Sequence, residues 1–204
     1  MLKHFPQQTK GTLYLTEGGQ ETEIMYKFGH DLPEFAMYPL LDRPEALVDL
    51  RGMYERYLEV AAAAGLSVVM GGLDYRASPD WGVKLGYTPE ALAEAQMRCI
   101  DFLREVSLPF RERIPAVFLS GIIGPRGDAY ALNRSITTDE AESYHRHQLG
   151  TLARAGVDLV TALTFNSVPE AVGVARAAAQ VGLPLAISFT LDSRTSRQIG
   201  RAHV

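Results

Sequence analysis

The sequence has very little cysteine, and the signals of several common protein classes are missing from it. Cys99 is the one cysteine among 204 residues, which excludes an internal disulfide framework and is typical of a reducing compartment. No stretch approaches the ~18 apolar residues that a membrane-spanning helix needs. Neither the Rossmann motif G-x-G-x-x-G nor a P-loop occurs. We therefore expect a soluble, cytoplasmic protein with no membrane partner.

Clusters of basic residues are missing as well. Lysine and arginine together number 20 against 24 aspartates and glutamates, which gives a formal net charge of −4. Binding to nucleic acid requires clustered positive charge to neutralise phosphates, so we expect no nucleic-acid partner. Hydrophobic residues make up 47% and charged residues 22%, the balance of an ordinary globular protein. We expect residues 1–204 to form one domain, whose oligomeric state the composition leaves open.

Short apolar segments alternate with helical patterns along the chain. Buried strands are predicted at 12–16, 67–72, 116–122, 157–163 and 184–190. These runs are almost continuously apolar, as in strands that are covered on both faces. Apolar residues recur at three- and four-residue steps from Pro44 to Ala64, and Thr88, Thr137 and Ser167 are predicted to cap the later helices. Strand–helix alternation of this kind predicts an α/β fold with a parallel sheet.

Polar or glycine residues follow each predicted strand. They are Glu17-Gly18-Gly19, Asp74-Tyr75-Arg76, Gly121 to Gly127, Thr164-Phe165-Asn166, and Ser188 with Thr190. Barrel enzymes build their sites from several strand ends on one face, whereas an open nucleotide-binding sheet would show a phosphate loop. The pattern favours a (β/α)8 TIM barrel, of which the chain supplies about five βα units.

Several motifs together are similar to one known family. They are "TEGGQETEI", "DYRASPDW", "SGIIGPRGDAY", "HRHQLGTLARAGVDLVTALTF" and "PLAISFTL". In this order and spacing, from about Thr12 to about Leu191, they resemble the homocysteine S-methyltransferase family. The resemblance implies a TIM barrel that holds the thiolate of homocysteine on zinc. A methyl group would pass to it from a sulfonium or quaternary ammonium donor, which yields methionine.

The resemblance also implies which residues bind the small-molecule acceptor. Glu17 would face its ammonium group, while Gly18 and Gly19 would let the backbone approach it. Tyr75 would lie at the mouth of the site and Thr164 at the end of the fourth strand. Two positions depart from the family pattern, because Glu17 stands where aspartate is usual and Leu163 where glutamate is usual. The acceptor is therefore homocysteine or a related thiol.

Other polar residues have simpler interpretations. We expect Gly121, Gly124 and Gly127 to shape a tight loop after the third strand. Cys99 has core spacing on its helix and is expected to be buried. His145 and His147 are two residues apart on a helix, so they cannot chelate one metal as an i, i+4 pair would, and a surface position is expected for both. Asp74 could pair with Arg76, and Glu21 and Glu23 are expected in solvent unless one of them lines the mouth.

Two alternative functions stay open. One is a non-catalytic, small-molecule-binding remnant of the same barrel. The other is a barrel lyase, which would require a Schiff-base lysine or a metal-binding set of carboxylates and histidines at the strand ends, and the lysines of the chain lie outside the predicted strands.

The resemblance places the zinc-binding cysteines after the sixth strand and near the eighth. We accordingly expect the chain to be C-terminally incomplete, with a non-native tail at about 192–204. We assign no catalytic residue and no metal ligand within it, and we expect it to bind no zinc and to transfer no methyl group as it stands.

Overall fold

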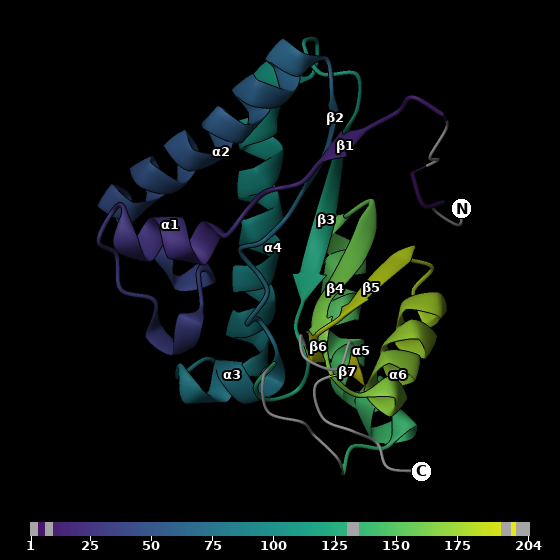
Figure 1. The fold of residues 1–204 in the computed structure, drawn as a ribbon. Helices are drawn as coiled ribbons and strands as arrows, with labels where there is room; N and C mark the ends of the chain where they lie inside the picture. Colours follow the sequence, from purple (N-terminus) through teal and green to yellow (C-terminus); the bar gives the residue numbers. More distant parts are fainter. Residues whose placement is uncertain (1–3, 7–9, 130–134, 193–196, 199–204) are drawn as a thin grey trace.

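The computed structural model describes residues 4–6, 10–129, 135–192 and 197–198. Its centre is a curled half-barrel of five parallel strands in the order β1-β2-β3-β4-β5 (Figure 1). The strands are β1 (Tyr14–Leu15), β2 (Ser67–Met70), β3 (Val117–Ile123), β4 (Leu159–Phe165) and β5 (Leu185–Phe189). All five predicted strands are therefore confirmed, with ends that differ by a few residues. The half-barrel is compatible with five units of a TIM barrel.

Helices connect consecutive strands and pack along the sheet (Figure 1). They are α1 (Gln20–Tyr26), α2 (Pro44–Ala64), α3 (Pro79–Lys84), α4 (Pro89–Ser107), α5 (Thr138–Ala155) and α6 (Val168–Gln180). Short 3-10 turns occur at Pro33–Phe35, Tyr38–Asp42 and Leu108–Phe110. Helix α4 contacts β3, while α6 contacts β4 and β5 and packs closely against α5.

Local sequence signals explain where these helices begin and end. Thr88 and Thr137 accept hydrogen bonds from backbone N–H groups of α4 and α5, and Thr137 forms the full capping box with Glu140. Gly65 and Gly156 end α2 and α5 with φ angles of 65° and 81°, a left-handed conformation that glycine adopts at little cost. Each glycine returns the chain directly to the next strand.

Apolar side chains between the sheet and the helices form one core. Leu50, Tyr54 and Leu58 of α2 belong to it, and so does Cys99 of α4, which is fully buried as predicted. Burial raises the pKa of the Cys99 thiol well above its ordinary value, so this thiol is not a reactive thiolate. No helix in the described part of the chain is both long enough and apolar enough to cross a bilayer.

Some elements were not predicted from the sequence. Helix α1 starts immediately after Gly19, so Gly18 and Gly19 form a strand–helix junction, and α3 follows β2 before the longer α4. Near the C-terminus, β6 (Leu191–Asp192) and β7 (Arg197–Gln198) pair antiparallel. Most of the segment at 192–204 lies outside the described residues.

Candidate functional site

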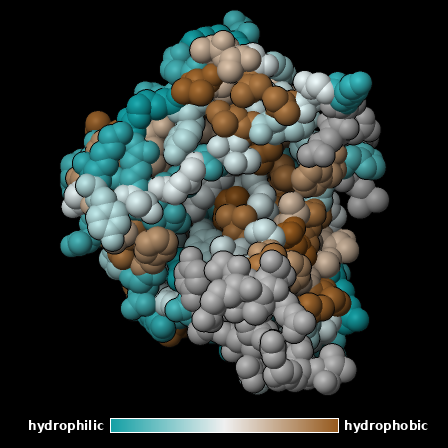
Figure 2. All heavy atoms as spheres, viewed as in Figure 1, coloured by the Kyte–Doolittle hydropathy of each residue, from teal (hydrophilic) through white to brown (hydrophobic). Residues whose placement is uncertain are grey.

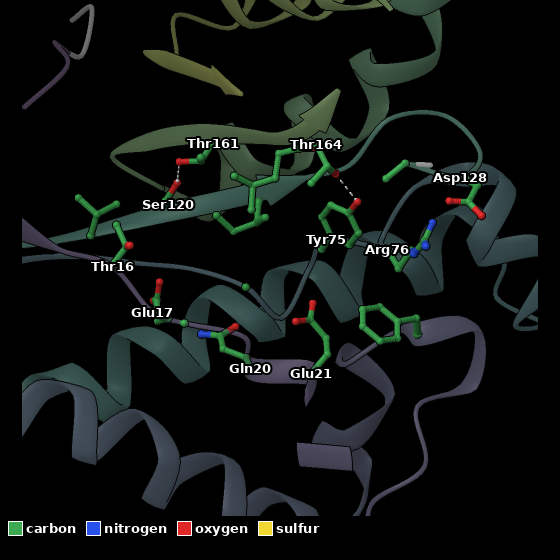
Figure 3. A pocket seen from close by; sticks show the side chains of 17 residues that line it. Thr16, Glu17, Gln20, Glu21, Tyr75, Arg76, Ser120, Asp128, Thr161 and Thr164 are labelled. Atoms are coloured by element: carbon green, nitrogen blue, oxygen red, sulfur yellow. Dashed lines mark hydrogen bonds between the residues drawn. The ribbon is translucent and has the colours of Figure 1, made fainter. Parts of the chain in front are cut away.

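A cavity of about 640 Å³ lies where the first four strands end. Figure 2 shows a hollow near the middle of this face, with apolar atoms visible inside it, and Figure 3 shows the side chains that line the cavity. The lining residues are Thr16, Glu17, Gly18, Gln20, Glu21, Phe35, Val69, Gly72, Tyr75, Arg76, Ser120, Ile122, Asp128, Ala129, Thr161, Leu163 and Thr164. A volume of this size suits a small-molecule ligand.

Glu17 enters the cavity from the end of β1. Its Oε1 accepts a hydrogen bond of 2.5 Å from the Gly71 backbone N–H, at the end of the neighbouring strand β2. The carbonyl oxygen of Gly71 in turn accepts from Gln20 Nε2 at 3.2 Å and from the Tyr54 hydroxyl at 2.6 Å. Burial raises the pKa of Glu17 from 4.5 to about 7, although the N–H contacts oppose the rise. Near neutral pH the carboxyl can therefore gain or lose a proton.

Tyr75 and Thr164 meet across the cavity. The Tyr75 hydroxyl lies 2.7 Å from Thr164 Oγ1, and Thr164 Oγ1 also lies 2.7 Å from the Leu163 carbonyl oxygen (Figure 3). Because the single Thr164 proton goes to that carbonyl, Tyr75 is the donor of the first bond. Thr164 has a φ of 60°, and the pairing of β4 with β5 is irregular between Ala162 and Phe165. A β-branched residue in the left-handed region is strained, and such strain gathers at functional sites.

Two further hydroxyl groups in the cavity were missed from the sequence. Ser120 Oγ of β3 lies 2.9 Å from Thr161 Oγ1 of β4 (Figure 3). Each is a small polar residue inside a mostly apolar strand, and that interruption was the available signal. These two hydroxyl groups are polar groups in a part of the lining that is otherwise formed by the apolar side chains of Val69, Ile122 and Leu163.

Charged residues of both signs line the cavity. Glu21 of α1 belongs to the lining, so one of the two acidic residues expected in solvent does line the site. Burial raises the pKa of Glu21, and the positive charge of Arg76 partly opposes the rise. Glu23 lies apart and pairs with Lys27 at 3.0 Å and with Arg56 at 2.5 Å.

Four of the five predicted binding residues lie on this cavity. Glu17, Gly18, Tyr75 and Thr164 belong to its lining, whereas Gly19 is the residue that precedes the first turn of α1. Gly18 turns its backbone N–H toward the Tyr57 hydroxyl at 3.3 Å. The structure thus brings the strand ends together, while their role toward a ligand stays a prediction.

The three glycines expected to shape the loop after β3 have different roles. Gly121 lies inside β3 and not after it, and a Cβ there would overlap the Leu152 side chain of α5. A Cβ on Gly124 would lie 2.7 Å from the Tyr75 ring, so this glycine permits a close approach. Gly127 has a φ of 85° with open space around it, and only there is the expected conformational role confirmed.

Asp74 does not pair with Arg76, contrary to one of the expectations. It is fully buried, its carboxylate accepts from the Ile122 backbone N–H at 3.1 and 3.2 Å, and Gln96 Nε2 donates to it at 3.4 Å. Arg76, two residues further along the turn, donates instead to the Gly127 carbonyl oxygen at 3.1 Å. Asp74 therefore fixes the turn after β2 to β3.

The buried Asp74 predicts a pH effect on stability. Burial raises its pKa from 3.8 to about 7, so between these values the folded state holds a proton that the unfolded state has released. The free energy of unfolding should accordingly fall as the pH rises through this window. Asp74→Asn removes this titrating group, so the free energy of unfolding of the variant should fall less with rising pH than that of the wild type. Urea denaturation of both proteins from about pH 4.5 to about pH 7.5 measures the difference. An equal slope in both proteins would contradict the assignment.

The two histidines expected at the surface have different environments. His147 is exposed, as predicted, but His145 is 1% exposed and its Nε2 lies 2.9 Å from Oε1 of the buried Glu170. The same Glu170 oxygen accepts from the backbone N–H of Arg126 at 2.6 Å. His145 therefore belongs to a buried polar network that fixes the loop after β3.

The family resemblance implies zinc, which would have to be held by donor side chains of the protein. Structural and catalytic zinc sites need three or four sulfur, nitrogen or oxygen ligands. Cys99 is buried in the core and does not line the cavity. Within the described ranges no three His, Cys, Asp or Glu side chains form a group that could hold a metal ion. The described residues therefore do not fit zinc.

Comparison with known proteins gives one family and one fold. The sequence profile of the homocysteine S-methyltransferase family matches residues 14–202. The homocysteine methyltransferase MmuM from Escherichia coli has a similar structure in its metallated form, with a TM-score of 0.73 and 19% identity over 93% of this chain and 66% of that chain. Its oxidised form gives a TM-score of 0.71 and 20% identity over the same shares. No curated protein sequence matches significantly.

At 19% and 20% identity the structural likeness shows a common fold, and the chain spans 66% of the length of that relative. The family profile covers most of the chain, from the first strand of the half-barrel to residue 202. The chain belongs to the homocysteine S-methyltransferase family.

Proposed function

We propose that the protein takes part in methyl transfer to a thiol acceptor and that the cavity at the strand ends binds this acceptor. One observation carries the proposal: Glu17 of the first strand end and Thr164 of the fourth face one cavity together with Tyr75, in a chain of this family. Homocysteine and related thiol amino acids are the acceptor class.

The acidic residues of the cavity suit the ammonium group of such an acceptor. One carboxylate oxygen of Glu17 accepts a hydrogen bond from the Gly71 N–H, and the other oxygen is left for a ligand. Leu163 stands where the family usually has glutamate, but Glu21 brings a second carboxyl to the cavity from α1. Glu21 thereby replaces the missing charge from a different element. A charge-assisted hydrogen bond to an ammonium group is stronger than a neutral one.

The remaining lining suits the thiol and the methyl donor. The hydroxyls of Ser120 and Thr161 lie among apolar residues, where a thiol end can be held without bulk water. Phe35 and Tyr75 line the cavity as well, and aromatic faces attract sulfonium and quaternary ammonium cations. Residues of this kind act by positioning, because methyl transfer requires donor and acceptor in line.

The first test of this proposal is the replacement of Glu17. Glu17→Gln should weaken homocysteine binding at least about ten-fold, since a hydrogen bond to a charged group is worth roughly 1.5–3 kcal/mol. The glutamine keeps an oxygen that can accept from the Gly71 N–H, so stability should change little. Glu17→Ala should weaken binding as well and should also cost stability, because it leaves that N–H without its partner. Titration calorimetry and thermal unfolding measure the two effects.

Matched ligands and a matched variant make the test specific. Norvaline replaces the thiol of homocysteine by a methyl group and should bind several-fold more weakly. Glu105→Gln, on the exposed side of α4, should leave all affinities unchanged. Equal affinity of the wild type and Glu17→Gln for homocysteine would contradict the role of Glu17, and equal affinity for homocysteine and norvaline would contradict a thiol site.

A further inference from the structure

Gly71, the residue directly after β2, is held from several sides. Its backbone N–H donates to Glu17 at 2.5 Å, and its carbonyl oxygen accepts from the Tyr54 hydroxyl at 2.6 Å and from Gln20 Nε2 at 3.2 Å. On the side of β3 there is no free space, because a Cβ on Gly71 would lie 2.8 Å from the Ser120 carbonyl oxygen. The contacts of Gly71 therefore determine where its N–H meets the Glu17 carboxyl.

Core packing explains the ring of Tyr54 but not its hydroxyl group. The ring lies fully buried in the core and packs against Phe102 with 5.8 Å between the ring centroids, and a phenylalanine would fill the same space. The hydroxyl adds a buried polar group, which needs a partner and finds it in the Gly71 carbonyl oxygen. Burial, and next the negative charge of Glu17, raise the pKa of Tyr54 well above its ordinary value. The hydroxyl therefore remains a donor at neutral pH.

A second tyrosine of α2 contacts the backbone on the other side of Glu17. Tyr57 lies three residues after Tyr54, on the same face of the helix, and its hydroxyl oxygen accepts from the Gly18 backbone N–H at 3.3 Å. Neither tyrosine belongs to the lining of the cavity. Helix α2 thus contacts the two backbone segments that adjoin Glu17 without touching the space that a ligand would occupy.

We propose that Tyr54 is a positioning residue, which together with Gln20 fixes Gly71 and through it holds the Glu17 carboxyl ready for the ammonium group of the acceptor. This assignment rests on the proposed function and adds to it a residue outside the cavity. A carboxyl that is already held in one orientation loses less conformational freedom when a ligand binds. Without the Tyr54 hydroxyl, the Gly71 carbonyl oxygen keeps only the longer contact to Gln20, and Gly71 is held less firmly.

The first measurement needs no ligand, because it follows the carboxyl of Glu17 itself by 13C NMR. In the wild type this group should titrate with a pKa of about 7. The Gly71 N–H lowers the pKa, so a more loosely held Gly71 in Tyr54→Phe should raise it further, by at least about 0.5. The other titratable groups near Glu17, Tyr57 of α2 and Glu21 of α1, stay unchanged in this variant.

The matched control is another buried tyrosine. Tyr38 is 1% exposed, and its hydroxyl has no hydrogen-bond partner among the described residues. Tyr38→Phe removes the same atom as Tyr54→Phe without changing a contact of Gly71. It should therefore keep the wild-type pKa of Glu17, which is identified in the spectrum by its loss in Glu17→Gln.

The second measurement compares two ligands that differ only in the ammonium group, homocysteine and 4-sulfanylbutanoate. By calorimetry the wild type should bind homocysteine at least about ten-fold more tightly. This ratio should fall at least about three-fold in Tyr54→Phe and stay unchanged in Tyr38→Phe. In a Glu17→Gln background, Tyr54→Phe should lower the ratio little further, because the charged group that it positions is absent.

The outcomes separate this proposal from the function on which it rests. An unchanged pKa of Glu17 or an unchanged ligand ratio in Tyr54→Phe overturns it, and so does an equal loss of affinity for both ligands, which packing alone would cause. A raised pKa in a protein that does not bind homocysteine supports the hold on Glu17 and contradicts the proposed function. If thermal unfolding shows that Tyr54→Phe is not folded, Gln20→Met removes the other donor to Gly71, and an unchanged pKa there overturns the proposal.

Discussion

Glu170→Ala is expected to lower the free energy of unfolding by about 3 kcal/mol. Glu170 is fully buried at the start of α6, where its Oε1 contacts His145 Nε2 and the Arg126 N–H at 2.9 and 2.6 Å. Alanine leaves the buried His145 and the part-buried Arg126 N–H without this acceptor. Removing one member of a buried, hydrogen-bonded pair costs more than the pair contributes, because the remaining group cannot return to water.

The same change should also affect the cavity. The loop that Glu170 holds through Arg126 continues to Asp128 and Ala129, which line the cavity. Glu170→Ala should therefore weaken acceptor binding along with stability, whereas Glu170→Gln, which keeps an oxygen for the Arg126 N–H, should lose less of both. Glu105→Ala, at an exposed site, should stay within about 0.5 kcal/mol of the wild type in urea denaturation. A loss of similar size in Glu105→Ala and Glu170→Ala would contradict this account.

Gly173→Ala is expected to destabilise the protein by about 2–3 kcal/mol. Gly173 lies on α6 at its contact with α5, and an added Cβ would lie 2.6 Å from Ala141 Cβ and from the Thr138 carbonyl oxygen, and 2.7 Å from the Glu142 backbone nitrogen. Two of these atoms belong to the backbone and cannot turn away. The two helices would have to separate, which disturbs the packing along their whole contact.

A second glycine in the same helix pair provides the control. Gly150 lies on α5, where an added Cβ would meet only the flexible end of Arg154 at 3.7 Å. Gly150→Ala should therefore stabilise the protein by up to about 1 kcal/mol, because alanine is the better helix former. Thermal and urea unfolding of both variants give opposite signs if the packing is as described. A stabilising Gly173→Ala would show that α5 and α6 do not approach so closely.

The order of strands and helices was predictable because its signals are local. Continuous apolar runs marked the strands. The helix starts were marked by Thr88, Thr137 and Ser167, whose side chains each accept a hydrogen bond from the backbone N–H three residues later. Helix α1 was missed because its sequence, QETEIMY, is mostly polar and its position depends on the sheet beside it. The first strand is shorter than predicted, and its preceding residue Leu13 is largely exposed at the edge of the sheet.

The site was predictable only in part, since the direction of a side chain depends on register and turns. Glu17, Gly18, Tyr75 and Thr164 were found through the family resemblance. Ser120 and Thr161 face the cavity because β3 and β4 pair with Ile122 opposite Thr161, a register that the sequence does not display. Arg76 was interpreted as a partner of Asp74 because the two charges are close in sequence.

His145 could have been placed correctly. The buried residues of α5 recur at Ala141, His145, Leu149 and Leu152, a stripe with the period of a helix. His145 belongs to that stripe and His147 does not. The spacing of the pair excluded a metal site, but it did not decide the burial of either residue.

The structure of the protein crystallised with homocysteine tests the central claim most directly. The account predicts homocysteine in the cavity at the strand ends, with its amino nitrogen at hydrogen-bonding distance from the carboxyl of Glu17 or Glu21. Its sulfur should lie on the side of Ser120 and Thr161. Homocysteine bound elsewhere, for example in the groove between α4 and α5, or no bound homocysteine at a concentration well above the measured Kd, would contradict the account.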